Sequence, residues 1–141
     1  MALEQVLTPK QKALEINLNP KIYGSFAEIG AGQETVRFFY RAGAASGTVA
    51  KAMSAYDKEM SDSIYGVEEN RRYVTQARLK KMLDHEMELM KERLIHDHYK
   101  EKAFFTYANT VTTIDYSKKN EGQGWICLLY TSPSPRDRQK S

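Results

Sequence analysis

Hydrophobic positions near the middle of the chain follow a helical period. Between residues 76 and 96 they recur at spacings of three and four, which draws one apolar stripe, while most charged residues fall outside it. Thr75 precedes this segment and is suited to cap a helix. The pattern predicts a long amphipathic helix near 76–96 whose apolar face packs against a core. The stripe consists of Leu79, Met82, Leu83, Met87, Met90 and Leu94.

Shorter helical and extended segments alternate along the rest of the chain. Helices are predicted over residues 8–18, which begin with Thr before Pro, and over residues 33–41, which Gly43 closes. Extended segments are predicted over 23–29, 48–56 and 103–113, and the last of these is the clearest because it is rich in aromatic and β-branched residues. A further strand starts near Ile126. The order predicts an α/β fold and leaves parallel and antiparallel pairing open.

The last fifteen residues have an unusual composition. Residues 127–137 resemble the in-frame translation of a transposase library sequencing adapter, and residues 138–141 fit the index and fixed bases that follow it. We therefore expect residues 127–141 to be an artefactual, disordered tail. Residues 1–126 are expected to be the N-terminal fragment of a longer α/β protein, an incomplete domain with an unpaired strand edge at its end.

Charge and cysteine content change once this tail is set aside. It contributes three of the 21 Lys and Arg residues, one of the 18 Asp and Glu residues, and Cys127, the one cysteine. Residues 1–126 then carry a net charge of +1, which favours neither nucleic acid nor an anionic membrane as a partner. The sequence shows no signal peptide and no apolar stretch near 20 residues, so we expect a cytoplasmic protein.

The first candidate site is a Gly-x-Gly turn between a predicted strand and a helix. Gly30, Gly32 and Gln33 could let backbone amides approach a phosphate or carboxylate at the helix N-terminus, or could form only a tight structural turn. The segment also resembles the first motif of S-adenosylmethionine-dependent methyltransferases, but Gln33 stands where the third glycine belongs. Thr35 breaks the dinucleotide-binding fingerprint in the same way.

The second candidate site is the small-residue loop that begins at Gly43. Ser46, Gly47 and Thr48 could cradle a phosphate, with Lys51 supplying charge, although the spacing is not that of a Walker loop. The alternative is close backbone packing between two elements. If both loops lie at one edge of the sheet, we expect a joint anion site with Gly32 within about 15 Å of Ser46.

Other polar residues give weaker indications. His85 and His96 are eleven residues apart on one helix, about 16 Å, so they cannot share a metal ion, and no metal site is predicted. Acidic residues at 57, 59 and 62 are typical of a solvated turn. The Arg71-Arg72-Tyr73 segment could bind an anion or form an exposed loop.

Residues 13–34, 47–57, 104–110 and 124–126 resemble the N-terminal part of a bacterial protein family whose members are several-fold longer. These members are often described as nicotinate-nucleotide adenylyltransferases and sometimes as TonB-dependent receptors. The sequence lacks the signal peptide and the run of amphipathic strands that a receptor needs. It also lacks the His-x-Gly-His signature of nucleotidylyl transferases.

Two functions follow from the residues and the resemblance. The resemblance implies a cytoplasmic nucleotide-handling enzyme of NAD biosynthesis, using ATP and magnesium, to which this chain contributes anion-binding loops and no catalytic signature. The alternative is a non-catalytic α/β scaffold or interaction domain. The substrate and the oligomeric state are left open.

Overall fold

A computed structural model describes residues 6–93, 101–113, 116–117 and 122–131. Four helices and four strands follow one another in this part of the chain, with one short 3-10 turn between them. In chain order they are α1 (Pro9–Asn17), β1 (Ile22–Gly30), α2 (Thr35–Ala42), η1 (Ala45–Gly47), β2 (Val49–Met53), α3 (Lys58–Tyr65), α4 (Gln76–Arg93), β3 (Ala103–Val111) and β4 (Gly124–Tyr130).

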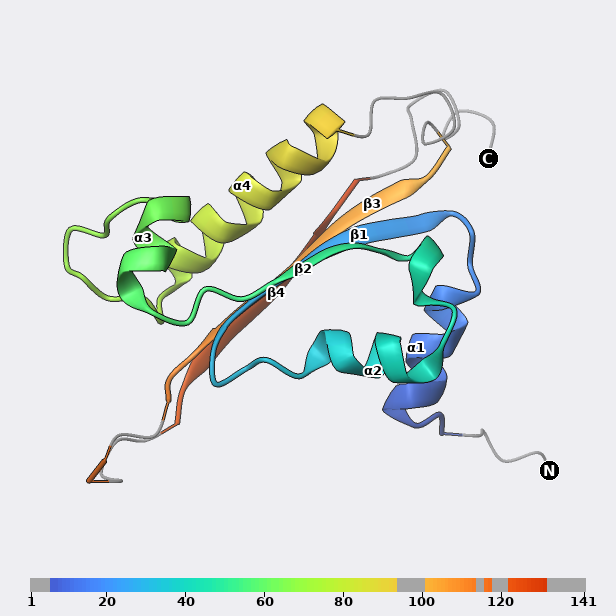
Figure 1. The fold of residues 1–141 in the computed structure, drawn as a ribbon, viewed down its shortest axis with the longest axis horizontal. Helices are drawn as coiled ribbons and strands as arrows, with labels where there is room; N and C mark the ends of the chain where they lie inside the picture. The colour runs from blue at the N-terminus through green and yellow to red at the C-terminus, as the bar shows by residue number, and fades with distance from the viewer. Residues whose placement is uncertain (1–5, 94–100, 114–115, 118–121, 132–141) are drawn as a thin grey trace.

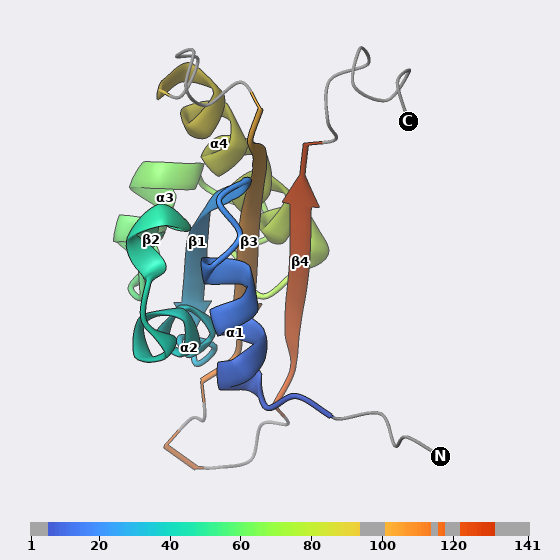
Figure 2. The same ribbon diagram turned by 90° about the vertical axis from the view of Figure 1, so that its right-hand side faces the viewer.

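The strands form one sheet in the order β2-β1-β3-β4. β1 is parallel to both β2 and β3, whereas β4 pairs antiparallel with β3. Helices α1 and α2 cover one face of the sheet, and α3 and α4 cover the other (Figures 1 and 2). The predicted α/β fold is therefore confirmed, and the sheet proves to be mixed.

The long helix α4 packs its apolar stripe against the sheet, as predicted. Leu79, Met82 and Leu83 are buried against small residues of the two central strands, Ala27 and Ala108. These alanines let the helix approach the sheet closely, and the apolar surface buried there is the main stabilising term. No helix in the described ranges is long and apolar enough to cross a membrane.

An aromatic cluster fills the other face of the sheet. The ring of Phe26 lies 5.0 Å from that of Phe39 and 5.4 Å from that of Phe105, centroid to centroid. Asn17 at the end of α1 donates to the carbonyl of Phe39 at 2.9 Å and to that of Gly43 at 2.8 Å. These contacts attach α1 to α2 and both helices to the sheet.

Helix ends follow the sequence signals. Thr8 and Gln11 form a reciprocal capping box at the start of α1. The Thr75 hydroxyl accepts from the amide of Arg78 at 3.1 Å, which confirms the predicted cap of α4. Gly43 ends α2 with φ of 89°, a conformation that side chains disfavour.

Helix α3 was not predicted from the sequence. Its eight residues carry three acidic or basic side chains and only a short apolar face, so the segment was interpreted as a solvated turn. Asp57 does form a cap, because its carboxylate accepts from the amide of Met60 at 3.0 Å. The extended run predicted over 48–56 ends earlier, at Met53.

Strand β4 extends into the segment expected to be disordered. Its residues Cys127 to Tyr130 pair with Ala108 to Phe105 of β3, so the expectation of disorder is wrong for residues 127–130. The antiparallel ladder explains the difference, since it continues the pairing that begins at Gly124. Every residue of β4 is exposed, and residues 132–141 lie outside the described part of the chain.

Candidate functional site

The Gly-x-Gly turn is packed tightly against the end of β3. Gly30 has φ of 77°, and a Cβ added there would lie 2.0 Å from the carbonyl oxygen of Val111. At Gly32 an added Cβ would meet the Asn109 side chain at 2.7 Å. Gln33 turns back, and its side-chain amide donates to the carbonyl of Gly30 at 3.0 Å. All three predicted residues thus have structural contacts within the turn.

A carboxylate of the chain itself occupies the N-terminus of α2. Glu28, which is 3% exposed, accepts from the amides of Thr35 at 2.9 Å and Val36 at 3.3 Å, and from the Asn109 side chain at 3.0 Å. A helix N-terminus attracts negative charge because its first amides lack intrahelical partners. An external anion at this turn would have to compete with Glu28.

The second predicted loop lies at the opposite end of the parallel strands from the Gly-x-Gly turn, before β2 begins. Ser46 and Gly47 are exposed in η1, directly before β2, and Thr48 is buried. Val49 pairs with Gly24, six residues before the end of β1, so about 20 Å of strand separates this loop from the Gly-x-Gly turn at 3.3 Å per residue. The structure therefore does not bring the two loops together into one site.

Lys51 points away from the loop that was expected to use it. The register of β2 shifts between Val49 and Lys51, and this bulge turns Lys51 toward α4 while Val49 packs on the α1/α2 face. The Lys51 ammonium forms an ion pair with Glu86 of α4, whose side chain is 1% exposed.

A cleft lies at the carboxyl ends of the parallel strands β1 and β3. It has a volume of about 690 Å³ and is lined by the ends of β1 and β3, the start of α3 and the loop between α3 and α4. This end of the sheet is on the left in Figure 1, beside α3. In open α/β sheets, ligands bind outside the carboxyl ends of the strands. We call this space the edge cleft.

Positive charge dominates the edge cleft. Lys58, Arg71 and Arg72 line it, and Asp57 is the one carboxylate among its described lining residues. The N-termini of α3 and α4 also meet there, because Asp57 and Thr75 cap these helices and both belong to the lining. Helix N-termini and cationic side chains both favour an anionic ligand.

A buried arginine holds the loop that carries Arg71 and Arg72. Arg78 is 1% exposed and donates to the carbonyl of Gly66 at 2.5 Å and to the carboxylate of Glu68 at 3.0 Å. Its other terminal nitrogen donates to the Ser61 hydroxyl at 2.7 Å. The Arg78 guanidinium thus connects α3, the loop and the first turn of α4.

Tyr73 connects the same loop to the sheet. Its phenol donates to Asp62 at 2.8 Å, and its carbonyl accepts from the Thr110 hydroxyl at 2.8 Å. The hydrogen bond to Asp62 raises the pKa of the Tyr73 phenol, with desolvation adding to the shift. The Arg78 guanidinium lies 5.0 Å from the centre of the Tyr73 ring. These contacts fix the floor of the edge cleft.

No sequence pattern indicated a role for Arg78, Glu86 or Ser25. Arg71 and Arg72 were predicted to bind an anion or to lie in an exposed loop. Among the described residues, no three His, Cys, Asp or Glu side chains are grouped so that they could hold a metal ion. His96 and His98 lie outside the described residues. The one signal in the sequence was an arginine, Arg78, four residues before Met82 and therefore on the apolar side of the predicted helix.

Comparison with known proteins shows the fold and no family. No protein-family profile matches the sequence, and no curated protein sequence matches it either. The structure is similar to competence/damage inducible protein CihA from Agrobacterium tumefaciens, with a TM-score of 0.58 and 12% identity over 92% of this chain and 82% of that one. A competence-damaged protein (CinA) superfamily protein from Enterobacter cloacae has a TM-score of 0.57 and 11% identity, over 94% and 83% of the two chains. At such identity the likeness shows the α/β fold alone.

Proposed function

We propose that this domain binds a mononucleotide through its phosphate in the edge cleft. The observation that carries the proposal is the convergence of Lys58, Arg71 and Arg72 with the N-termini of α3 and α4 at the carboxyl ends of β1 and β3. Arginine suits phosphate because its planar fork can donate two parallel hydrogen bonds. The volume of the cleft falls within the usual range for small-molecule sites.

An aromatic side chain supports a nucleotide over free phosphate. Tyr56 lines the edge cleft and is 62% exposed, so its ring is open to a stacking base. Thr112 and Thr113, directly after β3, lie on the same lining, and the backbone of Gln123 holds the Thr112 hydroxyl in place there.

The finer proposal is adenylyl transfer to nicotinate mononucleotide, which rests on the family resemblance of the sequence. Its magnesium ion would need oxygen ligands, and the cleft offers one carboxylate, Asp57, which already caps α3. The described lining of the cleft therefore offers a magnesium ion no carboxylate that is not already used as a helix cap. We propose nucleotide binding for this chain and derive no step through the metal.

Calorimetric titration with AMP, nicotinate mononucleotide and ATP tests the proposal. We expect saturable binding that weakens with added salt, and at least about a tenfold loss of affinity in the double variant Arg71→Ala, Arg72→Ala. Arg41→Ala is the matched control, because Arg41 is exposed at the end of α2 and does not line the cleft. Circular dichroism verifies that each variant is folded.

Two results would overturn the proposal. If a folded wild-type chain binds none of the three nucleotides, the scaffold alternative is favoured. If the double variant and Arg41→Ala bind AMP equally well, the ligand does not use the edge cleft. Binding of both ATP and nicotinate mononucleotide, with adenylyl transfer between them, would support the finer proposal.

A further inference from the structure

A polar row lies beneath α4 near the start of the parallel strands. Ser25 of β1 pairs in register with Lys51 of β2 on one side and with Thr106 of β3 on the other. Side chains in register on adjacent strands share a face of the sheet, and this face is the one that α4 covers. Apart from these three residues, the face beneath α4 is mainly apolar.

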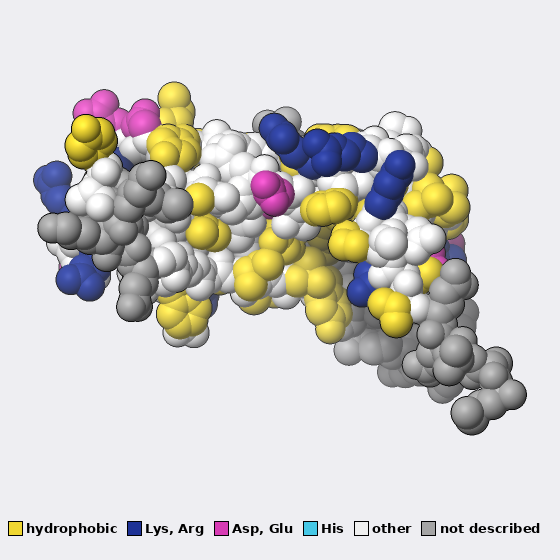
Figure 3. Space-filling view, turned by 90° about the horizontal axis from the view of Figure 1, so that it is seen from below, with side chains coloured by type: hydrophobic (Ala, Val, Ile, Leu, Met, Phe, Trp, Pro, Cys, Tyr) yellow, Lys and Arg dark blue, Asp and Glu magenta, His cyan; other side chains and the backbone are white. Residues whose placement is uncertain are grey.

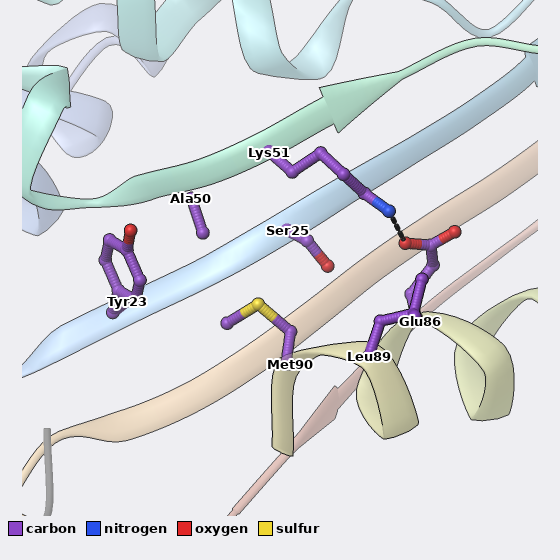
Figure 4. Close-up of a pocket in the computed structure, with 7 residues that line it drawn as sticks. All are labelled: Tyr23, Ser25, Ala50, Lys51, Glu86, Leu89 and Met90. Atoms are coloured by element: carbon purple, nitrogen blue, oxygen red, sulfur yellow. Dashed lines mark ion pairs between the residues drawn. The ribbon is translucent and has the colours of Figure 1, made fainter. Parts of the chain in front are cut away.

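A cavity opens between this row and the second half of α4. Its volume is about 360 Å³, and Ser25, Lys51 and Glu86 lie at its polar end (Figure 4). The remaining walls are supplied by Tyr23, Ala50, Leu89 and Met90. This α4 cavity lies on the opposite half of β1 from the edge cleft.

The Ser25 hydroxyl is buried in the wall of this cavity without a partner. Ser25 is 0% exposed, and its Oγ has no hydrogen-bond partner among the described residues. The Thr106 hydroxyl in the next strand has the same status. Buried hydroxyls are nearly always paired, because an unpaired one loses its bonds to water without replacement. Ser25 lines the cavity, so a bound molecule that shifts the side chains covering this hydroxyl would supply its missing partner.

The charges at the polar end compensate each other. Glu86 accepts from the Tyr65 phenol at 2.9 Å and forms its ion pair with Lys51, which is partly exposed. Burial, and then the charge and hydrogen bond of Glu86, raise the pKa of the Tyr65 phenol, so Tyr65 remains a donor. One cation and one anion face the cavity, and a second charge brought in by a ligand would be buried without its own partner.

We propose that the α4 cavity binds an uncharged small molecule that carries a carboxamide on an apolar ring. A carboxamide offers both an acceptor and donors, which matches the Ser25 hydroxyl together with the Lys51 ammonium and the Glu86 carboxylate. The ring would lie between Leu89, Met90 and Tyr23, where the thioether of Met90 makes a favourable contact with aromatic groups. This inference does not depend on the edge cleft or its ligand.

Three probes of one shape and different charge test the proposal. Benzamide is neutral, benzoate is anionic and benzylamine is cationic, so their affinities compare head groups on the same ring. We expect benzamide to bind, with both charged probes at least about tenfold weaker, when titrations are followed by protein-observed nuclear magnetic resonance. Shifts should be centred on Ser25, Lys51 and Met90.

Substitutions of Ser25 distinguish a ligand site from packing. Ser25→Ala removes an unpaired hydroxyl, so the melting temperature should stay equal or rise, while benzamide affinity falls about tenfold. Ser25→Val also removes the hydroxyl and narrows the polar end of the cavity, so benzamide affinity should fall at least as far. Ser46→Ala is the control, because Ser46 is exposed in η1.

The outcomes that overturn the proposal are definite. Wild-type protein that shows no benzamide shifts at about 10 mM, a concentration that detects even weak fragments, has no such site. Equal binding of all three probes would show that the polar end does not select charge. Unchanged benzamide affinity in Ser25→Ala would show that the hydroxyl plays no part.

Discussion

The guanidinium of Arg78 donates to the Glu68 carboxylate at 3.0 Å, and the two side chains are 1% and 8% exposed. Glu68 also accepts from Lys81 at 2.8 Å, one turn further along α4. Two cations of α4 thus hold one carboxylate of the loop that leads to Arg71 and Arg72. Removing one partner of such a buried pair leaves a charge without compensation, which costs about 3–5 kcal/mol.

Replacing Arg78 by lysine should destabilise the domain and weaken nucleotide binding together. Lysine keeps the charge but cannot reach Gly66, Glu68 and Ser61 with one ammonium group. We expect Arg78→Lys to lower the free energy of unfolding by about 2–3 kcal/mol in urea titration. Lys80→Ala, which removes an exposed pair with Asp84, should change it by less than about 0.5 kcal/mol. Equal losses in the two variants would contradict the role of Arg78.

The stability of the domain should fall in acid partly because of Glu68. Its hydrogen bond to Lys81, helped by Arg78, lowers the pKa of the Glu68 carboxyl in the folded state. A lowered folded pKa stabilises the protein above the unfolded value of about 4.3, and this contribution is lost as the pH falls through the folded pKa. Urea unfolding of the wild type and of Glu68→Gln at pH 6 and pH 3 measures this contribution of Glu68 to the free energy of unfolding.

Glu68→Gln should be less stable than wild type at pH 6 and should lose less stability on acidification. Glu69→Gln is the matched control, since Glu69 is the exposed neighbour of Glu68. We expect that control to keep the pH dependence of the wild type. Parallel pH curves for wild type and Glu68→Gln would contradict the assignment.

The elements with a clear hydrophobic pattern or a clear start and stop signal were predicted from the sequence. The stripe of α4 and the β-branched, aromatic run of β3 carry a repeated local signal, and both were confirmed. Helix α3 was missed because its N-cap, Asp57, and two further acidic residues were interpreted as a solvated turn. Pairing direction was not predictable, since it depends on contacts between segments far apart in sequence.

The candidate site was less predictable than the fold, because it too depends on contacts between segments far apart in sequence. The Gly-x-Gly turn was correctly placed after a strand, but its anion is Glu28, held there by Asn109 from 81 residues away. The edge cleft combines residues of α3, the following loop and β3, and none of these segments has a distinctive motif alone. The bulge that turns Lys51 to α4 leaves no sign in the residues around it.

Gly30 should tolerate no side chain. Its φ of 77° costs an alanine about 1–2 kcal/mol, and the added Cβ would overlap the carbonyl oxygen of Val111 at 2.0 Å. We therefore expect Gly30→Ala to lower the free energy of unfolding by more than about 2 kcal/mol. Gly47→Ala is the control, because no atom lies within 4 Å of its added Cβ. A Gly30→Ala variant as stable as Gly47→Ala would show that the turn can relax.

The last strand should make the protein self-associate. β4 lies at the edge of the sheet, carries no charged residue, and exposes apolar side chains on both of its faces, including Trp125, Ile126 and Leu128. The view from the α1/α2 side shows apolar side chains gathered on the surface (Figure 3). A long uncharged edge of this kind is a template for pairing with another chain.

The pairing of β4 with β3 indicates which groups are left for another chain. The amide of Thr112 donates to the carbonyl of Gln123, and that of Thr131 to the carbonyl of Phe104, so odd-numbered residues of β4 bond to β3. The alternation of an antiparallel ladder then turns the backbone groups of Ile126 and Leu128 to the open edge. A second β4 strand can pair there without displacing any described hydrogen bond.

Lysines on this edge should prevent the association. In light scattering over a range of protein concentrations, we expect Ile126→Lys with Leu128→Lys to weaken self-association at least about tenfold. Both side chains are exposed, so the variant should keep its melting temperature. Val67→Lys, at an exposed apolar residue of the α3–α4 loop, should associate like the wild type. If the double variant also associates like the wild type, contact between chains uses another surface, and the apolar groove between α1, α2 and β4 becomes the next to test.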